Sequence, residues 1–189
     1  METDNAAITM TDEELVEQIV KDNNTMLFGL LYDRYAKRIY HKCSIFSKSD
    51  QEAEDLTQDV FLMLFVKLGG FKGRSKFSTW VYAFTYNFCV NHVNRNKERK
   101  ISDKSDVLSE EVTKAAEVDD ESLYSIPLDK LKIALTRIDP EDKKLLLLKY
   151  QDGIPIKELC NVLGIGESAV KMRLKRAKAK LIEVYHKIP

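Results

Sequence analysis

Apolar side chains recur at intervals of three and four residues along most of this chain, a spacing that places them on one face of an α-helix. The pattern predicts helices over about 12–20, 26–46, 51–68 and 80–98, and over 128–138, 141–150, 156–163 and 167–185. Only 7 glycines and 4 prolines interrupt the 189 residues. We therefore predict an all-α chain.

Each predicted helix has an apolar stripe that we expect to face a core. In the first three helices the stripes are Leu15, Ile19 and Val20; Phe28, Leu31, Tyr35, Ile39 and Cys43; and Ala53, Leu56, Val60 and Met63. In the second half of the chain they are Leu128, Leu131, Leu135 and Ile138; the run Leu145–Leu148; and Val170, Leu174, Ala177 and Leu181.

Residues with strong terminal preferences mark several helix ends. Thr11 precedes three acids and is a candidate N-cap for the first helix. Ser78 or Thr79 is the expected cap of the helix that Trp80 begins. Gly164 is expected to end the helix before it, because glycine readily adopts the left-handed conformation of a helix C-terminus.

The net charge of zero conceals a strong separation of charge along the chain. Residues 1–66 hold thirteen acids and six bases, and the net charges of 67–100, 101–126 and 127–189 are +7, −6 and +6. The segment 101–126 also loses the helical periodicity, which is typical of a flexible linker. The sequence thus predicts two small helical domains, residues 10–100 and 127–189, joined by a flexible acidic linker, residues 101–126.

Composition excludes several classes of protein. No apolar run approaches the roughly 20 residues of a membrane helix, and the N-terminus lacks the layout of a secretory signal. We therefore expect a cytoplasmic protein without membrane insertion. Cys43, Cys89 and Cys160 lie far apart and form no CxxC pair, so we predict neither a disulfide framework nor a zinc site, and no cofactor.

The helix over 51–68 has an acidic side as well as an apolar one. Asp55, Gln58, Asp59 and Leu62 follow helical spacing away from the core stripe. A carboxylate stripe ending in an exposed leucine suits docking of a basic partner helix. A merely solvated acidic face accounts for the same pattern, and from these residues alone both interpretations remain open.

The following stretch is basic and aromatic. From Lys67 to Lys100 there are eight Lys or Arg against one acid. The rings among them are Phe71, Phe77, Trp80, Tyr82, Phe84, Tyr86 and Phe88. Cations that follow phosphates, beside rings on which unpaired bases stack, are typical of a single-strand nucleic-acid surface. The alternative is an amphipathic helix whose rings are core, and Trp80 is the ring we most expect to be core.

The last two helices have a helix-turn-helix layout. A short glycine-containing turn joins them, and the outward side of the final helix is basic. That side holds Ser168, Lys171, Met172 and Lys175, flanked by Arg173, Arg176 and Lys178. Such a helix places its early residues against base edges in the DNA major groove. A helical hairpin with a solvated basic side is the alternative.

Taken together, these segments resemble the sigma-70 family of RNA polymerase sigma factors, specifically its extracytoplasmic-function group. The first block comprises LYDRYAKRIY, AEDLTQDVF and FKGRSKFSTWVYAFTYNFCVNHVNR, and it is similar to the family's region 2. The second block runs from Ile138 to Leu181 and is similar to region 4. The resemblance implies that region 2 binds polymerase and the promoter −10 element, and that region 4 binds the −35 element.

The resemblance also assigns residues. It implies polymerase docking by Asp55, Gln58, Asp59, Phe61 and Leu62. It implies −10 binding by Phe71, Lys72, Gly73, Arg74, Ser75, Lys76, Phe77, Trp80, Asn87, Asn91 and Arg95, of which the loop residues receive a flipped base. It implies −35 binding by Glu167, Ser168, Lys171, Met172, Arg173, Lys175, Arg176 and Lys178. Gly166, Ala169, Met172 and Asn91 depart from the family pattern, which affects the expected −35 preference more than the fold.

A sigma factor makes no bonds, so the resemblance implies a protein that is not an enzyme. Its implied partners are the β′ and β subunits of RNA polymerase core, promoter DNA as duplex and as melted single strand, and an anti-sigma factor. A stand-alone helix-turn-helix regulator is the alternative, although it leaves the acidic helix and the aromatic loop unexplained. An enzyme acting on DNA would need clustered carboxylates or metal ligands, and Asp55 and Asp59 form the only tight pair.

Overall fold

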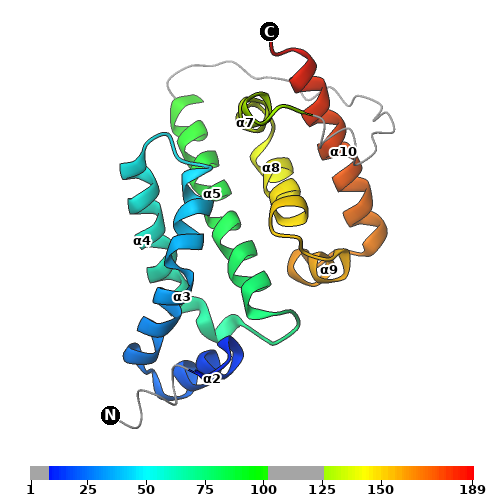
Figure 1. Cartoon of the computed structure of the whole chain (residues 1–189). Helices are drawn as coiled ribbons and strands as arrows, with labels where there is room; N and C mark the ends of the chain where they lie inside the picture. The colour runs from blue at the N-terminus through cyan, green and yellow to red at the C-terminus, as the bar shows by residue number, and fades with distance from the viewer. Residues whose placement is uncertain (1–8, 102–125) are drawn as a thin grey trace. The chain divides into compact units, whose positions relative to one another are not determined.

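The computed structural model describes residues 9–101 and 126–189 (Figure 1). Its helices are α2 (Asp12–Asp22), α3 (Thr25–Ser44), α4 (Asp50–Lys67), α5 (Phe77–Ile101), α7 (Leu128–Arg137), α8 (Pro140–Leu146), α9 (Ile156–Leu163) and α10 (Glu167–His186). A 3₁₀ turn, η1 (Leu68–Gly70), follows α4, and one π-helical turn, η2 (Leu147–Gln151), follows α8. Over these described ranges there is no strand, and the all-α prediction is confirmed.

The chain divides into two compact units, Met1–Cys89 and Val90–Pro189, with the boundary inside α5. The predicted acidic linker, 101–126, falls almost entirely outside the described residues; only Ile101, which ends α5, and Ile126 belong to them. The proposed domain boundaries at residues 100 and 127 therefore stay a prediction.

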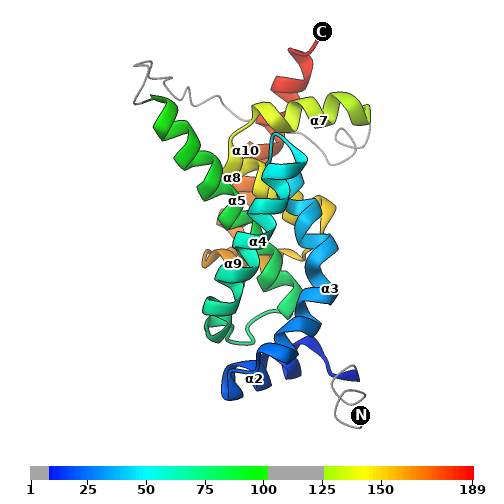
Figure 2. The same ribbon diagram turned by 90° about the vertical axis from the view of Figure 1, so that its left-hand side faces the viewer.

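Helix α3 is the central element of the first unit. It lies alongside α4, as Figures 1 and 2 both show, and it also packs on α2. Its predicted stripe is largely correct, since Leu31, Tyr35, Ile39 and Cys43 are buried. Aromatic rings join it to α5: the Tyr35 ring lies 5.6 Å from that of Phe77, and Phe46 lies 5.9 Å from Tyr86.

Two predicted core positions in this unit are wrong. Val20 is half exposed, and Met63 is also exposed, whereas Val16 and Leu64 are buried in their place. Intervals of three and of four residues both fit a helical period of 3.6, so the pattern alone does not decide which neighbour faces the core. The packing partner of each helix decides it.

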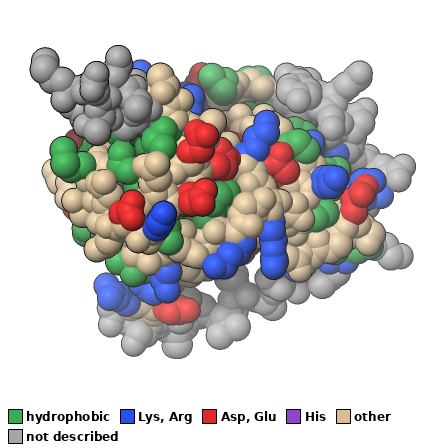
Figure 3. All heavy atoms as spheres, turned by 90° about the horizontal axis from the view of Figure 1, so that it is seen from below, with side chains coloured by type: hydrophobic (Ala, Val, Ile, Leu, Met, Phe, Trp, Pro, Cys, Tyr) green, Lys and Arg blue, Asp and Glu red, His purple; other side chains and the backbone are tan. Residues whose placement is uncertain are grey.

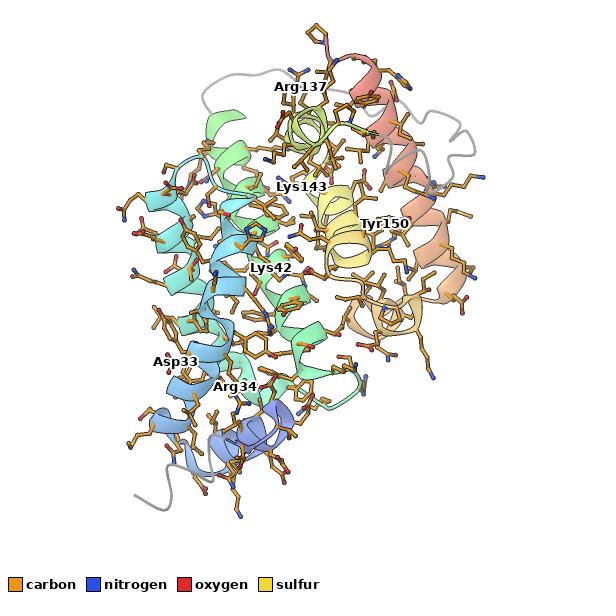
Figure 4. The ribbon with its side chains drawn as sticks, in the orientation of Figure 1. Asp33, Arg34, Lys42, Arg137, Lys143 and Tyr150 are labelled. Atoms are coloured by element: carbon orange, nitrogen blue, oxygen red, sulfur yellow. The ribbon has the colours of Figure 1, made fainter. Side chains whose placement is uncertain are left out.

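Helix α2 is fixed at its first turn. Thr11 and Glu14 form a reciprocal capping box, in which the Thr11 N–H donates to the Glu14 carboxylate at 2.7 Å. This bond lowers the pKa of Glu14. Asp12 accepts from the Arg34 guanidinium at 2.7 Å and from the Tyr35 hydroxyl; Figure 4 labels Arg34, which lies near the middle of α3. Burial, together with the bond to Asp12, raises the pKa of Tyr35 and keeps its hydroxyl a donor.

Helix α5 begins at Phe77, three residues before the expected Trp80, and neither Ser78 nor Thr79 is its cap. The Phe77 N–H instead donates to the Glu13 carboxylate, 2.8 Å away. Since Glu13 lies 64 residues earlier on α2, no local sequence pattern could have shown this cap.

The interior between α3 and α5 holds two features that the sequence did not predict. Lys42 is buried, which is rare for lysine; its ammonium lies 4.0 Å from the centre of the Tyr82 ring and donates to the Tyr86 hydroxyl at 3.4 Å (Figure 4). Cys43 and Cys89 are free thiols whose sulfur atoms lie 3.9 Å apart, although 46 residues separate them in the chain.

In the second unit, α10 packs on α7, α8 and α9. Its predicted stripe of Val170, Leu174, Ala177 and Leu181 is buried throughout, as is the run Leu145–Leu148, so both predictions are confirmed. The prediction for Leu128 is wrong: this first residue of α7 is exposed. The buried residues here are instead Ala134 and Ile138, the residue that caps the C-terminus of α7.

The turn between α9 and α10 depends on one glycine. Gly164 has φ +66°, in the left-handed region, and its N–H donates to the Cys160 carbonyl at 2.9 Å. A Cβ at this position would meet no atom within 4 Å, so a side chain is disfavoured by the backbone conformation and not by a clash.

We predict that Gly164→Ala lowers the free energy of unfolding by about 1–2 kcal/mol, the cost of left-handed backbone for a residue with a Cβ. Gly164→Asn should lose less, because asparagine tolerates this conformation. Urea unfolding of both variants measures the difference. An alanine variant as stable as the parent protein would contradict the left-handed turn.

Candidate polymerase- and DNA-binding surfaces

The outward side of α4 carries the predicted docking stripe. Asp55, Gln58, Asp59 and Leu62 are all exposed, and Leu62 exposes 68% of its surface. Val66, 71% exposed, lies one turn beyond Leu62 and continues the stripe with a second apolar side chain. The sequence reasoning missed Val66, although its position four residues after Leu62 was a usable signal. We call Asp55, Gln58, Asp59, Leu62 and Val66 the α4 stripe.

Phe61 does not belong to this outward side. It is only 5% exposed, and its ring lies 4.5 Å from that of Tyr32 and 6.4 Å from that of Phe28, both on α3. Phe61 therefore attaches α4 to α3, so that any part it has in docking is to hold the α4 stripe in place.

The loop between η1 and α5 is basic and exposed. Lys72, Arg74 and Lys76 all face solvent, and the Lys72 ammonium donates to the Gly69 carbonyl at 3.0 Å. Gly73 has φ +65°, and a Cβ there would meet no atom within 4 Å. Figure 3, viewed from the end of the molecule where α2 lies, shows carboxylates and Lys or Arg side chains on the same face.

A row of aromatic rings adjoins this loop. The Phe71 ring lies 5.3 Å from Phe77 and 5.7 Å from Trp80, and Trp80 lies stacked at 5.6 Å from Phe84. Phe77 is fully buried, whereas Phe71, Trp80 and Phe84 are partly exposed. The expectation that Trp80 is the core ring is therefore wrong: Phe77 and, one turn later, Val81 lie on the buried side of α5, and Trp80 lies beside it. Some of the rings are core and others reach the surface, and the interpretation of the exposed ones as a nucleic-acid surface stays a prediction.

The polar candidates on α5 continue from these rings. Asn87, Asn91 and Arg95 are exposed. They follow Trp80 and Phe84 at intervals of three and four residues, so all five lie along one side of α5. The partly exposed rings and the polar groups thus form a single strip along one helix.

The basic side of α10 is exposed over its first half. Glu167, Ser168, Lys171, Met172, Arg173 and Arg176 face solvent, while Lys175 and Lys178 are half-buried. An ion pair of 2.6 Å joins Lys171 to Glu167, which raises the pKa of the lysine and lowers that of the carboxyl. Because water screens an exposed pair, Lys171 remains available to another acceptor.

Contacts from α10 to its neighbours set the direction of this side. The Lys180 ammonium pairs with Asp142 of α8 at 2.8 Å, and the Lys130 ammonium of α7 donates to the Ile188 carbonyl at 3.5 Å. The N-cap residue of α10 is Gly166, which supplies no side-chain acceptor, so its carbonyl, which accepts the Val170 N–H at 3.0 Å, is its contribution to the first turn.

The described part of the chain has neither a metal-binding group of side chains nor a helix that could span a membrane. In residues 9–101 and 126–189 no group of three or more His, Cys, Asp or Glu side chains has an arrangement that could hold a metal ion. None of the helices within those ranges combines the length and hydropathy that a membrane crossing requires.

Two family models match the chain. Residues 31–99 match Sigma-70 region 2, and residues 128–181 match Sigma-70, region 4. Among curated relatives, the chain is 24% identical over 169 residues to the ECF RNA polymerase sigma factor SigW of Bacillus subtilis, covering 86% of this chain and 90% of SigW. It is 26% identical over 176 residues to the RNA polymerase sigma-H factor of Pseudomonas aeruginosa, covering 88% and 90%.

Solved structures share the fold. CnrH, in complex with the cytosolic domain of CnrY, is similar with a TM-score of 0.60 and 21% identity, covering 94% of this chain and 99% of that one. The sigma factor RpoE of Bartonella quintana, in complex with the anti-sigma factor NepR, gives 0.58 and 21%, covering 86% and 98%. The two family matches fall on the two blocks where the sequence resembles the family, and they include α4, α5 and the helix-turn-helix. The chain therefore belongs to the sigma-70 family and is an RNA polymerase sigma factor of the extracytoplasmic-function group.

Proposed function

We propose that this sigma factor docks on RNA polymerase core through the α4 stripe, captures the melted −10 element with the 71–76 loop and the strip along α5, and reads the −35 element with α10. The observation that carries the proposal is the loop itself. Its exposed Lys72, Arg74 and Lys76 lie next to partly exposed rings that lead directly into the polar side of α5.

The energetics suit strand capture. Opening a duplex costs about 1.4 kcal/mol of stacking per base step, whereas stacking one base on a protein ring contributes about 1–3 kcal/mol. Capture of one flipped base thus offsets the one or two steps that begin opening. Gly73 supports this role, because a residue without a side chain lets a ligand approach the backbone closely.

Docking through the α4 stripe rests on charge and exposed apolar area together. Asp55 and Asp59 favour a basic partner helix, and Leu62 and Val66 offer apolar area that no described residue covers. The β′ subunit is the proposed partner for this stripe, and the β subunit is a further proposed partner in the core. Because CnrH and RpoE were solved with CnrY and the anti-sigma factor NepR, an anti-sigma factor is proposed as a partner here also.

The same proposal covers activity and location. The polymerase supplies catalysis, and this chain supplies recognition, melting and docking in the cytoplasm, without an enzymatic activity or cofactor of its own. A stand-alone helix-turn-helix regulator is not favoured, because the match to region 2 and the α4 stripe would then have no use.

Charge reversal tests docking. Asp55→Lys with Asp59→Lys should raise the dissociation constant for core polymerase more than about 100-fold, since like charges placed against a basic partner cost several kcal/mol. The helical circular dichroism should not change. Asp50→Lys is the matched control, because Asp50 is an exposed acid of the same helix but lies about 140° around α4 from Asp55 and outside the α4 stripe. Undiminished affinity of the double variant would remove the α4 stripe from the docking surface.

Substitution of single basic residues on α10 tests recognition of the −35 element. Lys171→Ala should change the preference among −35 sequences, whereas Arg176→Ala should weaken every sequence alike and reduce the salt slope of binding by about 1. Run-off transcription from a randomised promoter library measures the first effect, and binding at several salt concentrations the second. Identical effects on every promoter would make α10 an electrostatic surface only.

Removal of the loop cations tests strand capture. Arg74→Ala with Lys76→Ala leaves the buried rings in place, so the double variant should still bind core polymerase and duplex promoters. It should fail to form the open complex, as measured by permanganate reactivity of unpaired thymines, and regain activity on a template pre-melted across the −10 element. Normal melting by the double variant would mean that α5 opens the duplex without the loop.

A further inference from the structure

Helix α2 contacts both ends of the 71–76 loop, which we propose captures the melted strand. The loop leaves η1 at Gly70 and enters α5 at Phe77. α2 packs on η1 at the first of these ends and supplies a hydrogen-bond acceptor at the second. The match to Sigma-70 region 2 begins at residue 31, so α2 lies outside the segment to which that family model applies.

The contact at the entry to the loop is apolar. A γ-carbon of Val20 lies 3.8 Å from the place that a Cβ at Gly69 would occupy, an ordinary van der Waals distance. Val20 therefore faces Gly69, although Val20 is half exposed. The Gly69 carbonyl accepts the Lys72 ammonium, so the same short segment holds the first loop cation.

The contact at the exit is polar. Lys76 is the residue before α5, and its carbonyl accepts the first helical bond, from the Trp80 N–H at 3.1 Å. A lysine side chain has no acceptor, so it cannot cap the orphan N–H groups of the first turn. Glu13 supplies the missing acceptor to the Phe77 N–H, and its negative charge also suits the positive end of the helix dipole.

Helix α2 is itself firmly anchored. The capping box of Thr11 and Glu14 orders its first turn, and Asp12 is held by Arg34 and Tyr35 of α3. Glu13 is therefore presented from a helix that is anchored to the core of the unit and not to the loop.

We infer that α2 holds both ends of the 71–76 loop in place, an arrangement we call the clasp, and that Glu13 is a positioning residue for promoter melting. By fixing the first N–H of α5, Glu13 sets where the loop ends and how Phe71, Phe77 and Trp80 meet beside it. The inference rests on the proposed role of the loop in strand capture, and it adds a requirement that α2 be in place before a base is bound.

A competing explanation gives the opposite sign. The N-terminus of a helix attracts phosphate, and in this explanation the Glu13 carboxylate occupies a position that a DNA phosphate would take. Removal of Glu13 would then increase binding of the melted strand and speed opening. The clasp predicts instead that removal of Glu13 slows opening of the promoter duplex.

The experiment compares Glu13→Ala, Glu13→Gln and Glu17→Ala in the full-length chain bound to core polymerase. Glu17 is exposed on the same helix and carries the same charge, so it is the matched control. Glu13→Gln keeps a neutral oxygen that accepts the Phe77 N–H. The probe is a duplex promoter selected from a randomised library with the parent holoenzyme.

We expect Glu13→Ala to slow open-complex formation about fivefold, the factor that corresponds to loss of one helix cap. Affinity for core polymerase should stay within about twofold of the parent, as for other surface substitutions. In Glu13→Ala, exchange of the Phe77 amide hydrogen with solvent should accelerate. Glu13→Gln should recover most of the melting rate. Glu17→Ala should melt promoters as the parent does. A template pre-melted across the −10 element should remove the defect.

Three results would overturn the clasp: melting by Glu13→Ala at the parent rate or faster, an equal defect in Glu17→Ala, or a defect that persists on the pre-melted template. Failure of the proposed function is recognised separately. If the Arg74→Ala, Lys76→Ala variant melts promoters normally, the loop has no part in strand capture; if that variant fails while Glu13→Ala melts normally, only the clasp is wrong.

Discussion

Aromatic packing of α3 against α4 and α5 is the contact on which the α4 stripe and the beginning of the strip along α5 depend. On one side of α3 the rings of Phe28 and Tyr32 meet Phe61 of α4. From the same side of α3, Tyr35 meets Phe77 of α5. Because these rings fix the rotation of α4 and α5 about their own axes, they decide which residues of each helix remain outside. The α4 stripe and the strip along α5 are what this packing leaves exposed.

The distribution of polar groups follows from the same constraint. Most cations and carboxylates on these helices lie at the surface, where charge is hydrated. Lys42 is an exception, and two tyrosine rings and a hydroxyl surround its ammonium in compensation. A protein that recognises DNA and polymerase needs such hydrated, complementary surfaces more than it needs a closed pocket.

The second unit obtains its reading surface differently. α10 is the core helix of this unit and also the helix that we propose faces DNA, since one side packs on α7, α8 and α9 and the other is basic. The left-handed turn at Gly164 lets α9 and α10 adjoin with only two further residues between them. Recognition and stability therefore depend on opposite sides of a single helix.

The sequence by itself determined the class of fold, both ends of α9 and the start of α10, most of the buried stripes and the outward position of Asp55, Asp59, Leu62 and three of the α10 cations, Lys171, Arg173 and Arg176. Periodicity and turn residues carry that information locally. Only the tertiary structure decided that Phe61 is buried and Trp80 is not, that Cys43 and Cys89 touch, and that Glu13 caps α5. Each of these depends on which side chain another helix brings into contact, and a contact between residues 46 or 64 positions apart has no signature in the local pattern of either one.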